Sequence, residues 1–369
     1  MNPILKYLKN IFAANRVIGE NLELQGLVKA DSFLQDLYAK NKFPGLSITV
    51  LKKGKTIFQK GYGYADSEQK SYIDPQQTIF RIASVSKPIA ATALACMVQD
   101  GILDLDASFY TYVPYYPKKQ WDFTIRQLAS HTAGIRGYQG KEYGLNKSLT
   151  IKDSLRVFED SPLLFEPGKG YLYNSFDWVL ISFAMQEASG IPFEQYVQER
   201  VLNPLGMINT LVPEPPNGKN KNGDFLQGTS RKATFYTKIA AGFRKAIPVD
   251  NFYKLAGGGY LSTSEDIAKF GQAYLGNKII VKEEILNQFI TSQQVNGKKI
   301  YYGLGWQVSE DLHGREFYGH VGNGVGGYSN FFIYPAEQLV FSILINCTDP
   351  KIQEELDSVI NCFFNPVEC

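Results

Sequence analysis

The segment RIASVSKPIAATALACMV (residues 81–98) places a serine and a lysine three positions apart, ahead of a proline and an apolar run. Residues three apart lie on one face of a helix, so the Ser84 hydroxyl and the Lys87 amine can approach each other. Pro88 fits a helix only in its first turn, which places both side chains at the helix start. There the helix dipole and partial burial lower the pKa of a lysine. A neutral lysine can take the proton of a serine that attacks a carbonyl, and free helix N–H groups can stabilise the oxyanion.

A plainer interpretation of this pair is a capped helix followed by a solvated lysine, because S-x-x-K is a common pattern. Ser86 is a rival nucleophile, but Ile89 lies three positions after it, so Ser86 has no matching lysine. Polar elements elsewhere in the chain must therefore decide between a structural and a catalytic role.

Two such elements favour catalysis. Tyr173 and Ser175 form a Y-x-S arrangement after a Pro-Gly pair and before a helical pattern. His320 and Gly322 lie at the end of one strand candidate and before the next. Gly322 has no side chain, so we expect a substrate to lie against the backbone there. These elements can converge with Ser84 on one cleft between two lobes.

The order of secondary-structure signals predicts how the chain positions these residues. Residues 46–66 read as two strands around a Lys-Gly turn, a hairpin signal. The apolar run after Ser84 has helix composition, and Gly101 is placed to end that helix. Further helices are predicted near 124–131, 150–160, 176–189, 193–202 and 264–275.

The C-terminal part changes from helical patterns to four successive strand candidates, followed by a last amphipathic helix, DPKIQEELDSVINCFF. Strands at both ends with helices between them predict an α+β fold, in which an antiparallel sheet flanked by helices contains an inserted, mainly helical lobe. The predicted organisation is a helical N-terminal extension (1–30) and a single catalytic domain (31–369), with an α/β lobe at 40–85 and 255–369 and a helical lobe at 86–254.

Composition excludes several classes of function. The formal net charge of +2 provides no basic field for nucleic acid. Three histidines and four cysteines without a C-x-x-C pair predict no metal site, and no organic cofactor is implied. No stretch has the length of a transmembrane helix, and residues 1–19 lack the pattern of a secretory signal. We therefore expect a cytoplasmic protein, or a periplasmic one if a leader was removed; the oligomeric state stays open.

Three other segments have structural interpretations. The Pro-, Gly- and Asn-rich residues 213–225 predict a surface loop. AGGGYLST (256–263) has no phosphate-loop lysine, so we expect its glycines to bring backbone close to the cleft. For His131, in LASHTAGI, we expect a capping or hydrogen-bonded packing role.

Several ordered motifs are carried together by this chain between about residues 43 and 346. They are RIASVSK, GILDLDASFYTYVP, IRQLASHTAGIRGY, EPGKGYLYNS, VLNPLGM, AGGGYLSTSEDIAKF and GHVG. With them the sequence resembles the serine β-lactamase and penicillin-binding-protein superfamily, and within it the class C β-lactamase-related serine hydrolases, especially the mitochondrial serine β-lactamase-like proteins. The resemblance implies a β-lactamase/transpeptidase-like fold.

The resemblance also implies roles for individual residues. Ser84 would be the acylated nucleophile, Lys87 the base that activates it, and Tyr173 the group that assists proton transfer to the leaving group and from the deacylating water. Ser175 occupies the third place of the Y-x-N or Y-x-S element and would orient substrate or lysine.

The strand element of the family has the pattern K-T-G or H-T-G. His320 and Gly322 match its first and last positions, and the N–H groups of Asn323 and Ser84 would form the oxyanion hole. Val321 replaces the threonine that helps to bind the ligand's carboxylate in penicillin-processing relatives, and Ser175 replaces the commoner asparagine. Both departures argue against efficient β-lactam hydrolysis.

The sequence as a whole predicts a serine hydrolase that acts through an acyl-enzyme on Ser84, on small-molecule or peptide substrates, with peptides or amides favoured. The alternatives are an esterase, or a weak β-lactamase or D-amino-acid-type peptidase. From another class, a catalytically inactive scaffold that keeps the penicillin-binding fold stays possible, although intact Ser84, Lys87 and Tyr173 argue against it.

Overall fold

The computed structural model describes residues 22–213, 231–276 and 280–364, and its backbone contacts divide the chain into two units. One unit combines Met1–Lys42 with Lys351–Cys369, and the other is Phe43–Pro350. In the first, helices α2 (Leu22–Ala39) and α11 (Gln353–Asn361) contact each other. The sequence-based division differs, because it ended the extension at residue 30 and kept 351–369 with the catalytic domain. Residues 1–21 of the predicted helical extension and most of the loop predicted at 213–225 lie outside the described residues.

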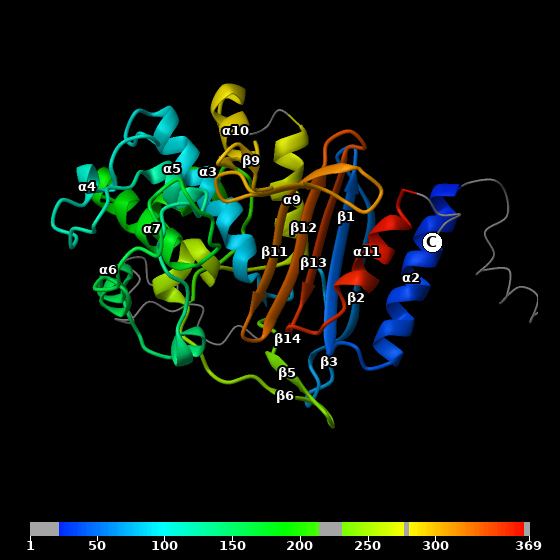
Figure 1. Cartoon of the computed structure of the whole chain (residues 1–369). Helices are drawn as coiled ribbons and strands as arrows, with labels where there is room; N and C mark the ends of the chain where they lie inside the picture. Colours follow the sequence, from blue (N-terminus) through cyan, green and yellow to red (C-terminus); the bar gives the residue numbers. More distant parts are fainter. Residues whose placement is uncertain (1–21, 214–230, 277–279, 365–369) are drawn as a thin grey trace, which may run out of the picture. The chain divides into compact units, whose positions relative to one another are not determined.

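An antiparallel sheet is the centre of the second unit (Figure 1). Its seven strands lie in the order β10-β11-β12-β13-β1-β2-β3, so strands from both ends of the unit meet where β1 pairs with β13. The predicted α+β class with an antiparallel sheet is confirmed. The strands are β1 (Gly45–Lys52), β2 (Lys55–Asp66), β3 (Ser71–Tyr72), β10 (Gln307–Glu310), β11 (Glu316–Gly324), β12 (Gly327–Tyr334) and β13 (Leu339–Ile345).

The hairpin of β1 and β2 turns at Lys53 and Gly54, as predicted. Both residues have positive φ, 50° and 77°, which is the requirement of a type I′ turn. This turn matches the right-handed twist of its strands, and glycine meets its second requirement without strain. The turn fixes the pairing next to it, Lys52 with Lys55, and a bulge between Val50 and Leu51 then shifts the register by one residue. Beyond the bulge, Leu46 lies beside Tyr62 of β2 on one side and Ile345 of β13 on the other.

Most of the helices lie between this hairpin and β10. The predicted helices at 124–131, 150–160, 176–189, 193–202 and 264–275 are confirmed in position, the second and fourth each as two shorter segments. The helices are α3 (Ser86–Gln99), α4 (Phe109–Tyr112), α5 (Ile125–Ala129), α6 (Ile151–Ser154), α7 (Phe176–Ser189), α8 (Phe193–Val197), α9 (Ser264–Leu275) and α10 (Glu283–Phe289), with 3₁₀ or π segments η1 (Ala83–Val85), η2 (Gly140–Gly144), η3 (Leu155–Val157), η4 (Gln198–Leu202), η5 (Phe252–Lys254) and η6 (Leu255–Gly259).

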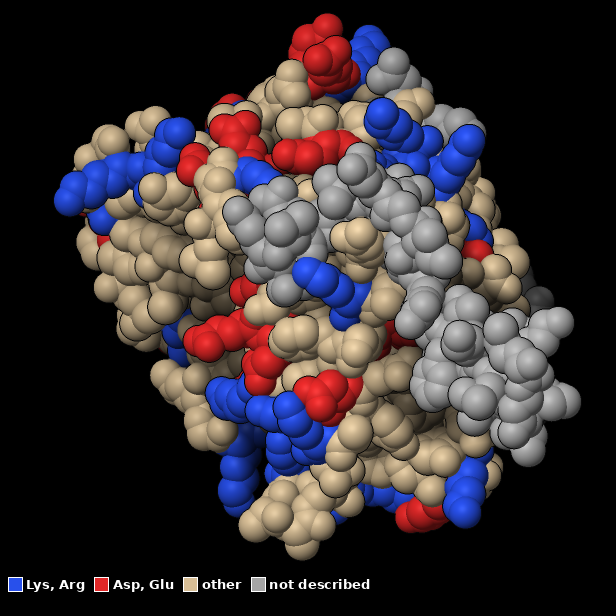
Figure 2. Space-filling model, turned by 90° about the vertical axis from the view of Figure 1, so that its right-hand side faces the viewer, with Lys and Arg blue, Asp and Glu red and all other residues tan. Residues whose placement is uncertain are grey.

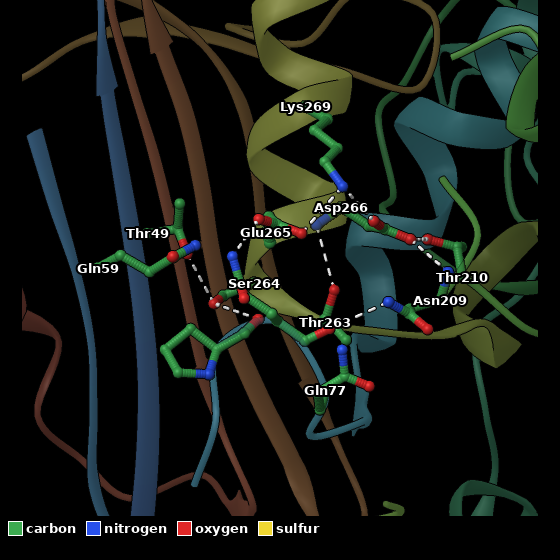
Figure 3. Close-up of polar contacts among 12 residues, drawn as sticks. Thr49, Gln59, Gln77, Asn209, Thr210, Thr263, Ser264, Glu265, Asp266 and Lys269 are labelled. Carbon is green, nitrogen blue, oxygen red and sulfur yellow. Dashed lines mark hydrogen bonds and ion pairs between the residues drawn. The ribbon is translucent and has the colours of Figure 1, made fainter. Parts of the chain in front are cut away.

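Helix α9 packs on β1, β12 and β13, and its first turn is tied down by side chains (Figure 3). Thr263 caps the helix by accepting the Asp266 N–H at 3.2 Å, and the Ser264 hydroxyl bonds that of Thr49 on β1 at 2.9 Å. The Asp266 carboxylate accepts the Asn209 N–H at 2.7 Å. One helix start thus joins the sheet to the chain around residue 209.

Short strands complete the unit. One pair, β4 (Phe80–Arg81) with β7 (Leu261–Ser262), holds the segment immediately before Ser84 against the chain that follows the glycine run. The remaining strands are β5 (Tyr236–Ile239), β6 (Gly242–Lys245), β8 (Gln294–Val295), β9 (Lys298–Lys299) and β14 (Cys347–Thr348).

Charged side chains of both signs occur together on the face shown in Figure 2, which agrees with the near-zero net charge. Within the described ranges, no helix combines the length and apolar character needed to cross a membrane.

Candidate active site

Ser84 lies in η1, the 3₁₀ turn that leads directly into α3. The preceding residue, Ala83, has a φ of 45°, a left-handed conformation that costs an L-residue roughly 1–2 kcal/mol. The first N–H groups of a helix have no intrahelical acceptor, so the N–H of Ser84 is available to a ligand. The strained Ala83 is a feature that the motif itself did not reveal.

Replacing Ala83 with glycine should therefore cost less stability than the same change in a regular part of the helix. Ala83→Gly removes the left-handed strain, whereas Ala90→Gly, at a fully buried position inside α3, removes none. We expect Ala83→Gly to be the more stable variant by about 1–2 kcal/mol, measured by urea denaturation. An equal or larger cost at Ala83 would contradict the strain.

Lys87 is fully buried, and its ammonium nitrogen contacts three oxygen atoms. Lys87 Nζ lies 3.1 Å from Ser84 Oγ, 2.7 Å from the Tyr173 hydroxyl and 2.7 Å from the Gly257 carbonyl oxygen. Tyr173 also donates its hydroxyl proton to Ser84 Oγ at 2.7 Å. The structure thus brings Ser84, Lys87 and Tyr173 together as predicted, in a closed triangle of hydrogen-bonding groups.

The electrostatics of the triangle separate its two possible bases. Burial, with a smaller contribution from the charge of Lys254, lowers the pKa of Lys87 to about 7, while Asp177 opposes the shift. Burial raises the pKa of Tyr173, so its hydroxyl keeps its proton at neutral pH. Lys87 is therefore the group that can be neutral and accept a proton near pH 7, and Tyr173 can only relay one.

Acylation of Ser84 should consequently lose rate as Lys87 gains a proton. Below pH 7 we expect the second-order rate constant for reaction with a fluorophosphonate to fall about tenfold per pH unit, with a plateau above about pH 8. The measurement is inactivation kinetics between pH 5 and 9. A rate constant that does not change between pH 5 and 8 would contradict a lysine base.

A pocket opens beside Ser84, and we call it the Ser84 pocket. Of the predicted residues, Ser84, Tyr173, Ser175 and Asn323 line it. The others on its wall are Arg81, Ala83, Gly137, Tyr138, Tyr143, Asn174, Asn251, Lys254, Gly257, Gly258, Gly324 and Val325. Gly257 and Gly258 confirm that the glycine run brings backbone close to the cleft.

Gly322 has a different position from the expected one. A Cβ atom at Gly322 would collide with the Ser329 hydroxyl and would lie 2.5 Å from the Ile82 carbonyl oxygen and 3.0 Å from the Ser84 nitrogen. The absent side chain thus lets β11 press against the backbone of the nucleophile, and Gly322 is not among the residues that line the pocket. Asn323, the next residue, does reach the pocket.

His320 is also set back from the Ser84 pocket, fully buried on β11. Its Nδ1 lies 2.7 Å from the Val321 carbonyl oxygen and its Nε2 3.0 Å from the Tyr302 hydroxyl. Burial, and secondarily the charge of Lys87, lowers the pKa of His320 to about 3. The ring is therefore neutral, donates from Nδ1 and accepts at Nε2, and supports the strand rather than lining the pocket.

His131 has the hydrogen-bonded packing position that the sequence predicted. Its Nδ1 lies 2.7 Å from the carboxyl of Asp177, a pair buried on both sides, and its ring packs 4.6 Å from that of Tyr173. Burial lowers the pKa of His131 and raises that of Asp177, so the uncharged forms are favoured. Asn174 donates to the same Asp177 oxygen at 2.7 Å, which ties the Tyr173 segment to α7.

Other pocket residues were not found by sequence reasoning. Lys254 belongs to no motif that we weighed, and the carbonyl of Gly257 carries no side-chain signal. Tyr138 ends the motif IRQLASHTAGIRGY, but no role at the site was assigned to it. The rival nucleophile Ser86 is fully buried, and its hydroxyl accepts the Tyr260 N–H at 3.2 Å, a structural role. Across the described residues, no three His, Cys, Asp or Glu side chains gather as a metal site.

Comparison with known proteins gives the class of this chain. The family model described as Beta-lactamase matches residues 30–361, so the chain belongs to this family. The mitochondrial serine β-lactamase-like protein of Homo sapiens is 27% identical over 389 residues, covering 80% of this chain and 69% of the human protein. The resemblance predicted from the motifs is thereby confirmed.

Solved structures confirm the β-lactamase/transpeptidase-like fold. The octameric penicillin-binding protein homologue from Pyrococcus abyssi superposes with a TM-score of 0.77 at 24% identity, covering 92% of this chain and 78% of that one. The D-amino acid amidase from Ochrobactrum anthropi SV3 has a TM-score of 0.76 at 24% identity and covers 93% and 98%.

Proposed function

We propose that this chain is a serine hydrolase that cleaves peptide or other amide bonds through an acyl-enzyme on Ser84. The observation that carries the proposal is the hydrogen-bonded triangle of Ser84, Lys87 and Tyr173, with Lys87 Nζ 3.1 Å from Ser84 Oγ. Lys87 Nζ contacts both hydroxyls of the triangle, those of Ser84 and Tyr173. The lowered pKa of Lys87 suits a general base at neutral pH.

Acylation then follows from the positions of the protons. Ser84 Oγ attacks the carbonyl carbon while its proton passes to Lys87 Nζ, and the N–H groups of Ser84 and Asn323 stabilise the oxyanion. The proton returns through the Tyr173 hydroxyl to the leaving nitrogen as the C–N bond breaks. In the second half, water adds to the ester with its proton going to Lys87, and the C–Oγ bond breaks as Ser84 regains a proton.

The preference for amides draws on two further points. A D-amino acid amidase shares the fold over nearly the whole of both chains. In addition, the hydroxyl of Tyr173 lies 2.7 Å from both Ser84 Oγ and Lys87 Nζ, where it can protonate a leaving nitrogen. An amine leaves a tetrahedral intermediate only when its nitrogen is protonated. The leaving group of an activated ester, whose parent alcohol or phenol has a low pKa, can leave as the anion without protonation.

The proposal is tested by labelling. An uncharged fluorophosphonate should form an adduct on Ser84, located by mass spectrometry, and Ser84→Ala should abolish it. Ser86→Ala is the matched control, because it removes the neighbouring hydroxyl that bonds the Tyr260 N–H and should leave labelling intact. Folded protein that forms no Ser84 adduct with the fluorophosphonate or with a fluorescent penicillin would assign the scaffold function instead.

Substrate assays separate the types of hydrolase. Peptide p-nitroanilides, p-nitrophenyl esters and a chromogenic cephalosporin should be turned over by the wild type and not by Ser84→Ala. Turnover of the anilides supports the amidase, and turnover of esters alone would assign an esterase. Because Val321 replaces a carboxylate-binding threonine, we expect the cephalosporin to be the poorest of the three.

A further inference from the structure

Tyr173 lies in a segment that forms neither helix nor strand, residues 169–175. Its hydroxyl nevertheless lies 2.7 Å from both Ser84 Oγ and Lys87 Nζ. A shift of about 1 Å at a reacting group can cost about 10²-fold in rate, so the position of this hydroxyl matters for the proposed chemistry. Contacts from outside the segment must therefore hold Tyr173 in place.

The residues on both sides of Tyr173 are bound to one buried pair, His131 and Asp177. Leu172 donates its N–H to the His131 carbonyl oxygen at 3.0 Å. Asn174 donates from Nδ2 to Asp177 Oδ2 at 2.7 Å, and its Oδ1 accepts the Asp177 N–H at 2.8 Å. His131 Nδ1 lies 2.7 Å from the same Asp177 oxygen. The pair thus fixes the chain at the residue before Tyr173 and at the residue after it.

The ring of His131 also supports the ring of Tyr173 directly. Its centroid lies 4.6 Å from that of Tyr173 and 4.9 Å from that of Tyr302. The backbone of His131 has a φ of 62°, in the left-handed region that L-residues rarely adopt. This strained residue is the one whose carbonyl accepts the Leu172 N–H. One residue therefore contacts the Tyr173 segment through both its backbone and its ring.

Stability alone does not favour such a pair. Among the described residues, His131 Nε2 and Asp177 Oδ1 have no hydrogen-bond partner, although both side chains are buried. Buried polar atoms without a partner destabilise a fold, and apolar residues of similar volume in place of a buried ionisable pair are often neutral or stabilising. Backbone strain of the kind found at His131 gathers at functional sites. The pair is therefore expected to do more than fill the core.

We propose that His131 and Asp177 are positioning residues, which hold the Tyr173 hydroxyl where it can pass a proton from Lys87 to the leaving nitrogen. This inference rests on the proposed function, since it concerns a step of the same reaction. Neither His131 nor Asp177 lines the Ser84 pocket, so both act through Tyr173 and not on the substrate. Because the leaving group of an activated ester needs no proton, loss of the pair should slow amide cleavage more than cleavage of such esters.

The competing explanation is that the pair only stabilises the start of α7. Asp266 provides a matched control, because it is also a buried carboxylate in the first turn of a helix, α9 (Figure 3). It accepts the Asn209 N–H at 2.7 Å, and it does not line the Ser84 pocket. Asp177→Ala and Asp266→Ala each remove a buried acceptor from a helix start, but only Asp177 is bonded to the Tyr173 segment.

The test is the ratio of kcat/KM for a peptide p-nitroanilide to kcat/KM for the p-nitrophenyl ester of the same acyl group, measured in the full chain. Asp177→Ala should lower this ratio by about 10- to 100-fold, towards the ratio of Tyr173→Phe. Asp177→Asn keeps an oxygen that can accept from His131 and Asn174, so it should keep most of the ratio. Asp266→Ala should leave the ratio unchanged. An unchanged ratio in Asp177→Ala, or an equal fall in Asp266→Ala, would overturn the proposal.

A second pair of substrates separates this inference from the proposed amidase activity. If the wild type cleaves esters alone, ethyl and p-nitrophenyl esters of one acid give the same comparison, because ethoxide is too basic to leave without a proton. If Asp177→Ala does not fold, His131→Phe takes its place with the same expected fall, since it fills a similar space without the Nδ1 donor. Labelling of Ser84 by the fluorophosphonate reports on the hydrolase itself, so absence of activity is distinguishable from a failure of positioning.

Discussion

Replacing Lys87 with methionine should lower the rate of Ser84 acylation by about 10²- to 10⁴-fold, the contribution of a positioned general base. Methionine fills much of the same buried space but has no nitrogen to accept the Ser84 proton, and Tyr173 cannot substitute because its pKa is raised. The measurement is the second-order rate constant for fluorophosphonate labelling, and Lys269→Met, on the outer side of α9, is the control. Labelling at the wild-type rate would mean that another group is the base.

The same variant makes a prediction about stability and pH. Folded Lys87 has a pKa of about 7 and its ordinary value is 10.5, so between these values the unfolded chain binds the extra proton. Stability of the wild type therefore rises with pH in this window, and Lys87→Met lacks the rise. Between pH 6 and 9 the free energy of unfolding of the variant should fall by about 2–3 kcal/mol relative to the wild type, measured by denaturant titration. A constant difference would contradict the lowered pKa.

Gly322→Ala should damage both the nucleophile and the fold. The new methyl group would meet the Ser329 hydroxyl, which donates to the Ile82 carbonyl at 2.7 Å, and would crowd the Ser84 nitrogen. Overpacking of this kind costs typically about 1–3 kcal/mol. A shift of about 1 Å at a reacting group can cost about 10²-fold in rate, so labelling of Ser84 should fall by a similar factor.

Gly137→Ala is the matched control for this change. Gly137 also lines the Ser84 pocket, but a Cβ there would lie 3.8 Å from the Asn174 Cβ, an ordinary contact. We expect near wild-type stability for this variant. Equal behaviour of the two alanine variants in denaturation and labelling would show that β11 does not press on the nucleophile.

Local patterns were sufficient to predict much of this structure. The Lys-Gly turn is visible in sequence because a type I′ turn needs residues that accept positive φ, and α9 is visible because its cap and its helical period coincide. Ser84, Lys87 and Tyr173 were found because their residue types are chemically specific and each belongs to a motif.

Features that depend on distant chain segments were not visible in this way. The positive φ of Ala83 results from the packing of η1 between β11 and η6, and a lone alanine gives no sign of it. His320 matched a motif position, yet its ring turns inward to Tyr302. Lys254 lines the same pocket as Tyr138 and Ser84. These residues lie far apart in the sequence, so the sequence alone did not predict that Lys254 belongs to the site.

The pairing of β1 with β13 has a consequence for how activity arises during synthesis. The seven-stranded sheet cannot be completed until β13 has left the ribosome, because β13 is the strand that pairs with β1 on the side opposite β2. Contacts between such distant segments form slowly, since the loop-closure entropy must be overcome first. Asn323 and Gly322 also arrive with these last strands. A nascent chain therefore carries Ser84 without the proposed oxyanion partner, so the proposed active site is complete only when these last strands have folded.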